Sequence, residues 1–357
     1  MISLNTSLCK LLNIEYPIIQ AGMAGGSTTV EMIVNVCNSG ALGTLGAAYM
    51  PPEEIRKAIQ AIKKQTSHPF AVNIFSANDK VKTNENKKEV EDTLLEIGKN
   101  LGIEAESITM DAPDLSEERF QVLIDEEVPI ISTAFGILPA NKMKVVKEKD
   151  IKIIAMVTTI NEAISAEKAG VDVIVAQGSD AGGHRSTFDI ERHPNGANIG
   201  TFSLVPQVVE NVSIPVVAAG GVMNGKGLVA ALALGAEGVQ MGTRFLGTTE
   251  ADIHPLYKKA IFESTEEDTV LTKSFSGRPA RGIKNKFIEE FDKSGISPLA
   301  FPMQNTATRN IRNEAHKQNK VDYMSLWAGQ GLRTMKKETT VAVIIKEVLK
   351  EAKNILC

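Results

Sequence analysis

Cysteine is scarce in this sequence, and the spacing of the few cysteines excludes two kinds of stabilised protein. The 357 residues include three, Cys9, Cys37 and Cys357, with no CxxC pair and no histidine pair beside them. An odd number of widely spaced cysteines forms neither a disulfide framework nor a thiolate zinc site. The first residues also lack the charged start and apolar core of a secretory signal. We therefore expect a cytoplasmic protein with reduced thiols.

Long apolar runs and blocks of one charge are missing as well. The most apolar long segment, residues 227–245, is interrupted by Glu237 and several glycines, well short of the roughly 20 apolar residues that cross a bilayer. Lys and Arg number 39 against 43 Asp and Glu, without a basic block. The composition therefore predicts neither a membrane nor a nucleic-acid partner. No cluster of ligating side chains predicts a metal, so small molecules are the expected partners.

The sequence does contain a series of eight short apolar runs, each closed by glycine or a polar residue. The runs occupy residues 16–23, 40–46, 70–76, 128–135, 151–158, 171–178, 214–221 and 237–245. Runs that are apolar on both faces suit parallel strands covered by helices. Helical patterns lie between them, and eight such units close a barrel. We predict an α/β fold, a (β/α)8 TIM barrel.

Two segments are too long for a minimal barrel. Residues 77–127 hold more than one helical pattern, and residues 246–336 form a long excursion before an amphipathic helix over 338–356. Insertions of this length commonly decorate the working face of a fold. We predict a barrel made of residues 1–245 plus 337–357, with 246–336 as a lid-like insertion over the active-site face.

Polar residues finish several of the predicted strands, where the active site of such a barrel lies. Met23 follows the first run in a glycine-rich segment, Asn73 lies in the third run and Gln177 ends the sixth. Amide side chains both donate and accept hydrogen bonds, which suits a ring system with alternating carbonyl and N–H groups. A flavin is such a ring system.

The last two runs end in glycine-rich turns, where these barrels commonly bind phosphate. The turns contain Gly220, Gly221, Gln240, Met241, Gly242 and Thr243. Glycine lets the backbone approach a ligand closely, and a following helix N-terminus favours negative charge. The glycines could also serve tight turns alone. A phosphate site together with a ring site points to FMN. We predict FMN contacts at Met23, Asn73, Gln177, Gly182, Gly183, Gly220, Gly221, Gln240, Met241, Gly242 and Thr243.

A single histidine follows two glycines in the segment "AQGSDAGGHRSTF", residues 176–188. Gly182 and Gly183 let the chain turn over the cofactor, which places His184 above the barrel mouth. Histidine is the side chain suited to proton exchange near neutral pH, so we predict that His184 is catalytic. The alternative is a surface-loop histidine without a role. That alternative is our prediction for the other four histidines, His68, His193, His254 and His316.

Three arginines could add positive charge to the same face if the insertion folds back over it. They are Arg185, Arg278 and Arg281, the last two in "SGRPARG". Arginine forks bind planar anions such as carboxylates. Alternatively, Arg278 and Arg281 pair with acidic neighbours and order the insertion. For Trp327, the only tryptophan, we predict core packing.

Taken in order, eight segments resemble the class I nitronate monooxygenases, formerly called 2-nitropropane dioxygenases. The segments are "QAGMAGGSTT", "HPFAVNIF", "AQGSDAGGHRSTF", "IPVVAAGGVMNGKG", "VQMGTRFL", "SFSGRPARGIKNKF", "MQNTATR" and "MSLWAGQG", which span residues 20–331. The resemblance implies FMN contacts at Asn73, Gln177, Gly182, Gly220 and residues 240–243, and a catalytic His184. It also implies a detoxifying oxidation of alkyl nitronates, including propionate 3-nitronate, by O2 to a carbonyl compound and nitrite through a flavosemiquinone.

Two other functions fit the same barrel. An FMN-dependent enoyl-acyl-carrier-protein reductase shares the "AGGH" segment and the phosphate turns, and it takes hydride from NADH or NADPH. The segments "AQGSDAGGHR" and "SLWAGQG" and the continuation of "SGRPARG" into "IKNKF" favour the nitronate enzyme. An FMN-binding sensor would not need a histidine over the ring. The sequence leaves open the physiological nitronate, the acceptance of neutral nitroalkanes, the role of His184 as base or polarising group, and the oligomeric state.

Overall fold

Eight parallel strands form a closed barrel in the computed structural model, which describes residues 3–77, 86–104 and 108–356; Cys357 lies outside them. The strands are β1 (Ile18–Gln20), β2 (Gly43–Gly46), β3 (Phe70–Phe75), β4 (Ile130–Ala134), β5 (Lys152–Val157), β6 (Val173–Gln177), β8 (Val216–Ala219) and β9 (Gly238–Met241). Their order is β1-β9-β8-β6-β5-β4-β3-β2. Hydrogen bonds from Leu42 to Ile18 and from Gln20 to Leu42 close the ring. The predicted (β/α)8 barrel is confirmed.

Alternation along the strands separates two apolar layers. Val173 and Val175 on β6 belong to a cluster inside the barrel, whereas Ile174 between them belongs to the layer under the helices, as the two-residue period of a strand requires. Leu8 and Leu12 of α1 (Ser7–Leu12) pack on the inner cluster. The interior is therefore a packed core, and a pocket has room only at the strand ends.

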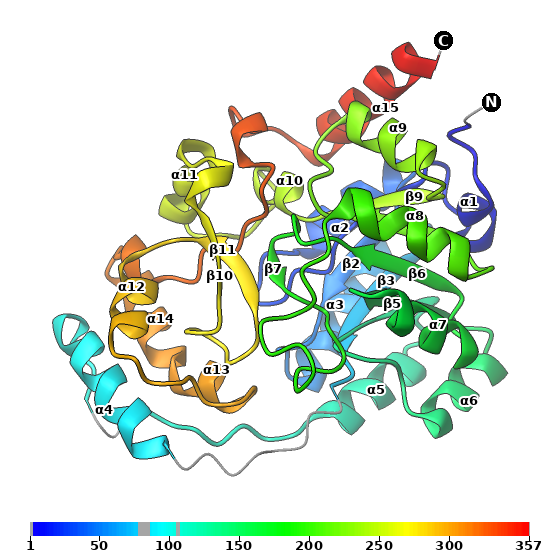
Figure 1. Ribbon diagram of the computed structural model, residues 1–357. Coiled ribbons are helices and arrows are strands. Elements are labelled where there is room, and N and C mark those ends of the chain that lie inside the picture. The colour runs from blue at the N-terminus through cyan, green and yellow to red at the C-terminus, as the bar shows by residue number, and fades with distance from the viewer. Residues whose placement is uncertain (1–2, 78–85, 105–107, 357) are drawn as a thin grey trace.

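Helices surround the barrel on its outer side (Figure 1). They are α2 (Val30–Asn38), α3 (Pro52–Gln65), α5 (Ser116–Asp125), α6 (Ala140–Glu148), α7 (Ile160–Lys168), α8 (Thr201–Asn211), α9 (Gly225–Ala233) and α15 (Val341–Leu356). Helix α15 contacts both α9 and α2. It therefore takes the eighth position in the ring, as the amphipathic pattern near residue 350 predicted.

The predicted boundary of the last strand was wrong. Strand β9 ends at Met241, and the short helix α10 (Thr243–Leu246) replaces the rest of the run 237–245. The N–H of Phe245 donates to the carbonyl of Gly242, and the Phe245 side chain is fully buried. A short apolar run is compatible with a strand or with a helix. The apolar Phe245 therefore did not indicate that the strand ends before Gly242.

The excursion holds most of a second apolar core. Its elements are α11 (Pro255–Glu263), η3 (Glu266–Asp268), β10 (Thr269–Thr272), β11 (Ala280–Ile283), α12 (Lys286–Lys293), α13 (Met303–Ala307), α14 (Arg309–Lys317), η4 (Val321–Tyr323) and η5 (Leu332–Thr334). Helix α4 (Lys87–Gly98) joins this core through Val90 and Leu94, and η1 (Lys99–Leu101) joins it through Leu101. Figure 1 shows α4 beside α12. The division into a barrel and a lid at 246–336 stays a prediction.

A three-stranded sheet ties the excursion to the barrel. Its order is β10-β11-β7, where β7 (Gly183–His184) comes from the loop after β6. His184 pairs with Ala280 and Gly183 with Arg281, antiparallel. The segment that carries His184 is therefore held by strand hydrogen bonds to the excursion.

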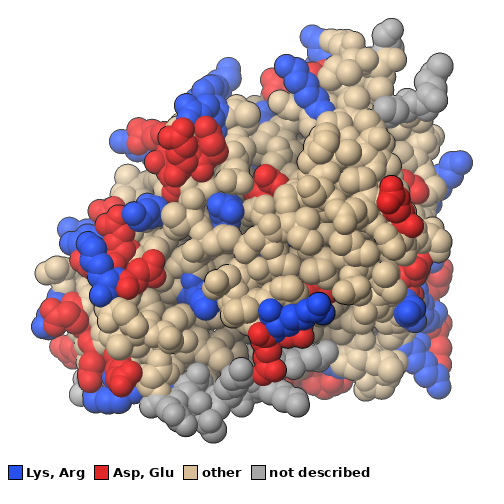
Figure 2. Space-filling view, viewed as in Figure 1, with Lys and Arg blue, Asp and Glu red and all other residues tan. Residues whose placement is uncertain are grey.

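The surface carries charges of both signs. On the face in Figure 2, positive and negative side chains lie interspersed. Among the helices of the described residues, none is both long and apolar enough to cross a bilayer. Within those same residues, no group of three or more His, Cys, Asp or Glu side chains could hold a metal ion.

Candidate active site

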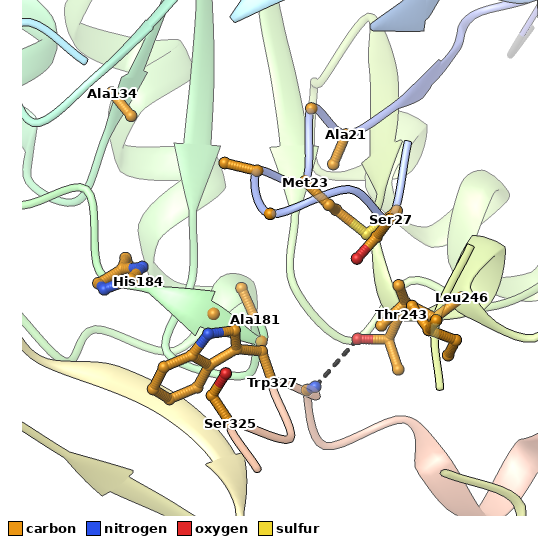
Figure 3. Close-up of a pocket in the computed structure, with 18 of the residues that line it drawn as sticks. Ala21, Met23, Ser27, Ala134, Ala181, His184, Thr243, Leu246, Ser325 and Trp327 are labelled. Atoms are coloured by element: carbon orange, nitrogen blue, oxygen red, sulfur yellow. Dashed lines mark hydrogen bonds between the residues drawn. The ribbon is translucent and has the colours of Figure 1, made fainter. Parts of the chain in front are cut away.

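One pocket of about 400 Å³ opens at the carboxyl ends of the barrel strands. Every predicted site residue lines it: Met23, Asn73, Gln177, Gly182, Gly183, His184, Gly220, Gly221, Gln240, Met241, Gly242 and Thr243. Figure 3 shows Met23 and Thr243 on one side of the cavity, with His184 and Trp327 on the other. The volume lies in the range of small-molecule sites, about 300–1,000 Å³. The fold thus brings together residues that are far apart in the sequence.

The turns after β8 and β9 present bare backbone to this pocket. Gly220 and Gly221 have φ angles of +113° and +72°, a backbone conformation that residues other than glycine rarely adopt. A Cβ atom on Gly220 would lie 2.7 Å from Thr201 Oγ1. Close packing and positive φ both require glycine here, so the turn geometry alone would account for these residues. The same geometry leaves the backbone accessible to an anionic group.

His184 lies on the pocket wall among aromatic rings. Its ring centroid is 5.7 Å from that of Phe135 and 5.4 Å from that of Trp327. Its Nε2 atom lies 2.8 Å from the hydroxyl of Ser276, which comes from the excursion. The imidazole ring is therefore held by contacts with the barrel, through Phe135, and with the excursion, through Ser276 and Trp327.

The environment of His184 removes its charge. Burial, together with the positive charges of Arg278 and Arg312, lowers the pKa of His184 to about 3. The ring is thus neutral at pH 7, and the role of His184 as base or polarising group stays a prediction. A neutral imidazole can still donate one hydrogen bond and accept another.

Gln177 holds the loop that carries His184. Its Nε2 donates to the carbonyl of His184 at 2.9 Å, and its Oε1 accepts from the N–H of Ser186 at 2.9 Å. Asn73 Nδ2 similarly donates to Ser132 Oγ at 3.0 Å. Both amides line the pocket, but both polar atoms of Gln177 form hydrogen bonds to the loop after β6. This geometry suits a residue that positions the His184 loop as well as one that contacts a cofactor ring.

Arg185 was predicted to add charge to the working face, and that prediction was wrong. Its side chain is fully buried, and its guanidinium donates to the carbonyls of Gln177, Gly178 and Ala197. It therefore braces the loop from behind.

The two arginines of the excursion are also braced by the chain around them. Arg278 is buried, donates to the Thr187 carbonyl at 3.0 Å and lies 4.1 Å from the Phe135 ring centroid. Arg281 donates to the Ser179 carbonyl and to Thr269 Oγ1. Both arginines connect the excursion to the loop after β6. Whether either contacts an anionic substrate stays a prediction.

The sequence profile described as nitronate monooxygenase matches residues 5–351. The curated probable nitronate monooxygenase of Staphylococcus saprophyticus is 42% identical over 353 residues, 99% of each chain. That of Staphylococcus haemolyticus is 42% identical over 329 residues, 92% of each. The chain belongs to the nitronate monooxygenase family.

This assignment confirms the family that the eight segments resemble, and with it an oxidoreductase. Solved structures agree with the nitronate monooxygenase fold. Nitroalkane oxidase from Streptomyces ansochromogenes superposes with a TM-score of 0.91 at 33% identity, covering 99% of this chain and 100% of the other. FabK from Thermotoga maritima gives 0.78 at 31% identity, with coverage of 99% and 98%.

Sequence reasoning missed several pocket residues of this nitronate monooxygenase family member. Trp327 packs against the second core, as predicted, but it also lines the pocket beside His184. His254 and His316 also line the pocket, with ring centroids 4.5 Å apart, rather than lying on unrelated surface. All three come from the excursion. No local pattern in the sequence placed that segment over the barrel, although its length suggested a lid.

An aromatic wall was missed as well. The ring centroids of Phe75 and Phe135 are 4.4 Å apart, and Tyr49 packs on Phe75 at 5.3 Å. Phe75 ends β3 and Phe135 directly follows β4. Their positions at strand ends were a usable signal, because side chains there face the pocket.

Proposed function

We propose that the protein binds FMN and oxidises alkyl nitronates, such as propionate 3-nitronate, with O2 to a carbonyl compound and nitrite. Members of this family are flavin enzymes. The observation that carries the proposal is the position of His184, hydrogen-bonded to Ser276 in a pocket that the glycine turns after β8 and β9 also line. Such a site offers an uncharged hydrogen-bonding group to an anion and bare backbone to a phosphate.

The described residues fit FMN in shape and in donor chemistry. Gly220, Gly221 and Gly242 leave the backbone open at the ends of β8 and β9, where the phosphate would lie. Asn73 and Met23 line the barrel mouth and would contact the flavin ring there. Bound FMN supplies the electron-accepting chemistry that amino-acid side chains lack.

His184 would hold the substrate rather than deprotonate it. An alkyl nitronate has already lost its α proton, so its oxidation needs no strong base. With Nε2 accepting from the Ser276 hydroxyl, the neutral ring can donate a hydrogen bond from Nδ1 to a nitronate oxygen, and Gln177 anchors its backbone. The aromatic wall beside it limits water near the reacting carbon.

The deciding experiment uses the purified protein without oxygen. Propionate 3-nitronate is mixed with it in one cuvette, and NADH or NADPH in another, while flavin absorbance is followed. We expect the nitronate to change the flavin spectrum and both nicotinamides to leave it unchanged. Rapid bleaching by a nicotinamide, with the nitronate inert, would favour the enoyl-acyl-carrier-protein reductase, the alternative to which FabK corresponds.

A further inference from the structure

Two buried polar atoms in the pocket have no hydrogen-bond partner among the described residues. They are the Tyr49 hydroxyl and the Nε of Arg312, and both side chains line the pocket. Burying such groups without a partner is unfavourable, and native structures rarely leave them unpaired. A ligand with acceptor atoms would satisfy both. The mechanism proposed above uses neither residue.

The Arg312 guanidinium is oriented by the excursion. Its NH2 group donates to the carbonyl of Asn305 at 2.6 Å and to Asn305 Oδ1 at 3.1 Å. Holding one edge of the planar group fixes the direction of the rest. A guanidinium fixed in this way keeps its Nε–H donor and its positive charge for an anion such as a carboxylate.

Electrostatics favour an anion at this place. Burial lowers the pKa of Arg312 to about 10 and raises the pKa of Tyr49 to about 12, so at pH 7 one is a cation and the other a neutral phenol. The charge of Arg312 acts on both Tyr49 and His184 by lowering their pKa. Two cations, Arg312 and Arg278, thus act on this part of the pocket.

The Tyr49–Arg312 site is connected to His184 along one wall of the pocket. Tyr49 follows β2 and packs on Phe75 of β3. Aromatic contacts continue from Phe75 through Phe135 to His184. The unpartnered Tyr49 hydroxyl therefore belongs to the wall that ends at the candidate catalytic histidine.

We propose that Tyr49 and Arg312 bind a carboxylate at the far end of the substrate, while its nitronate group faces His184. The inference rests on the proposed function and adds a determinant of specificity. It makes the preferred substrate a nitronate with a second negative charge a few bonds from the reacting carbon. Neutral-tailed alkyl nitronates would bind through His184 and the aromatic wall alone.

The test compares two nitronates of equal carbon number. Propionate 3-nitronate carries the carboxylate, and propyl-1-nitronate has a methyl group in its place. Arg312→Gln is expected to lower kcat/KM for the carboxylated substrate about 10- to 100-fold through KM, the effect of losing a hydrogen bond to a charged group. For propyl-1-nitronate the expected change is under about 3-fold. Tyr49→Phe should show the same selectivity with a smaller loss.

Two further variants separate binding from folding. Lys317→Gln removes an exposed charge from the same helix, α14, and should leave the ratio of the two kcat/KM values unchanged. Arg312→Lys keeps the charge but not the fork and should give an intermediate ratio. Melting temperatures of all variants report folding.

Equal losses for both nitronates in Arg312→Gln, or no loss for either, would overturn the carboxylate assignment. In that case Arg312 contacts the nitronate itself or has only a structural role. Turnover of propyl-1-nitronate by the wild-type protein tests the proposed function alone. If the wild-type protein oxidises neither nitronate, the proposed function fails first, and the specificity proposal fails with it.

Discussion

The protonation state of His184 is set by neighbours that are distant in sequence. Burial against aromatic rings disfavours the charged imidazolium, and the positive charges of Arg278 and Arg312 add to this effect. The result is a histidine that can hydrogen-bond to an anion without exchanging a proton at physiological pH. This property suits a substrate that arrives already deprotonated.

We therefore expect kcat/KM for a preformed nitronate to show no ionisation of His184 between about pH 5 and 8, since its pKa is about 3. His184→Asn should lower kcat/KM about 100-fold at every pH in that range, because a hydrogen bond to the reacting anion is lost. The two pH profiles should be parallel. An inflection near the ordinary histidine pKa of 6.5 that disappears in the variant would contradict this assignment.

At this scale, the strand ends were predictable and the excursion was not. Asn73, Gln177 and the glycine turns follow apolar runs, and a barrel directs the carboxyl ends of its strands to one face. Ser276 and Arg312 lie in a segment whose path depends on long-range packing. Nothing in their immediate neighbours indicates that they reach the barrel mouth.

Among the structural elements, the β7–β11 pairing decides how the site is assembled. It joins the loop after β6 to the excursion at His184 and Ala280. The loop also approaches the chain near residue 329: a Cβ atom on Gly182 would lie 2.4 Å from the Gly329 nitrogen. The backbone of the excursion thus packs directly on the backbone of the loop.

Gly182→Ala is expected to disrupt this contact, because neither backbone can yield without moving the pocket wall. We predict a loss of about 1–3 kcal/mol in the free energy of unfolding and a lower ratio of flavin to purified protein. Gly200→Ala is the matched control, since Gly200 has a φ of −63° and no atom within 4 Å of an added Cβ. Similar behaviour of the two variants in thermal melts and flavin content would show that the close approach is unimportant.

Element positions in the barrel could be predicted because strands buried on both faces leave continuous apolar runs. The two-residue strand β7 leaves no such run, and its partner β11 lies about 100 residues further along the chain. The boundary after β9 was missed because Phe245 and Leu246 remain apolar in the helix that follows. Short strands and helices that are stabilised by residues distant in the sequence cannot be predicted from local hydrophobic patterns.

The whole molecule contains one barrel core and a second core that spans the excursion and α4. Phe275 and Phe287 stack in the second core with ring centroids 4.3 Å apart, and Phe275 contacts Trp327 at 5.7 Å. Trp327 in turn lines the pocket. Packing in the second core therefore supports one wall of the site.

Phe287→Ala should create a cavity and cost about 3–5 kcal/mol in the free energy of unfolding, because Phe287 is fully buried. We also expect a raised KM for nitronates, since Trp327 loses its support through Phe275. Phe202→Ala serves as the control, because Phe202 is 75% exposed. Denaturant unfolding and steady-state kinetics measure both effects. A destabilised variant with an unaltered KM would separate the second core from the pocket wall.

Helix α15 makes completion of the barrel depend on the order of synthesis. Ribosomes build the chain from its amino end, so the gap between α9 and α2 stays open until residues 341–356 emerge. At translation rates of about 5–20 residues per second, the excursion delays that moment by on the order of 5 to 20 s. During this interval the surfaces of α9 and α2 that α15 later contacts stay uncovered, and a chaperone could cover them.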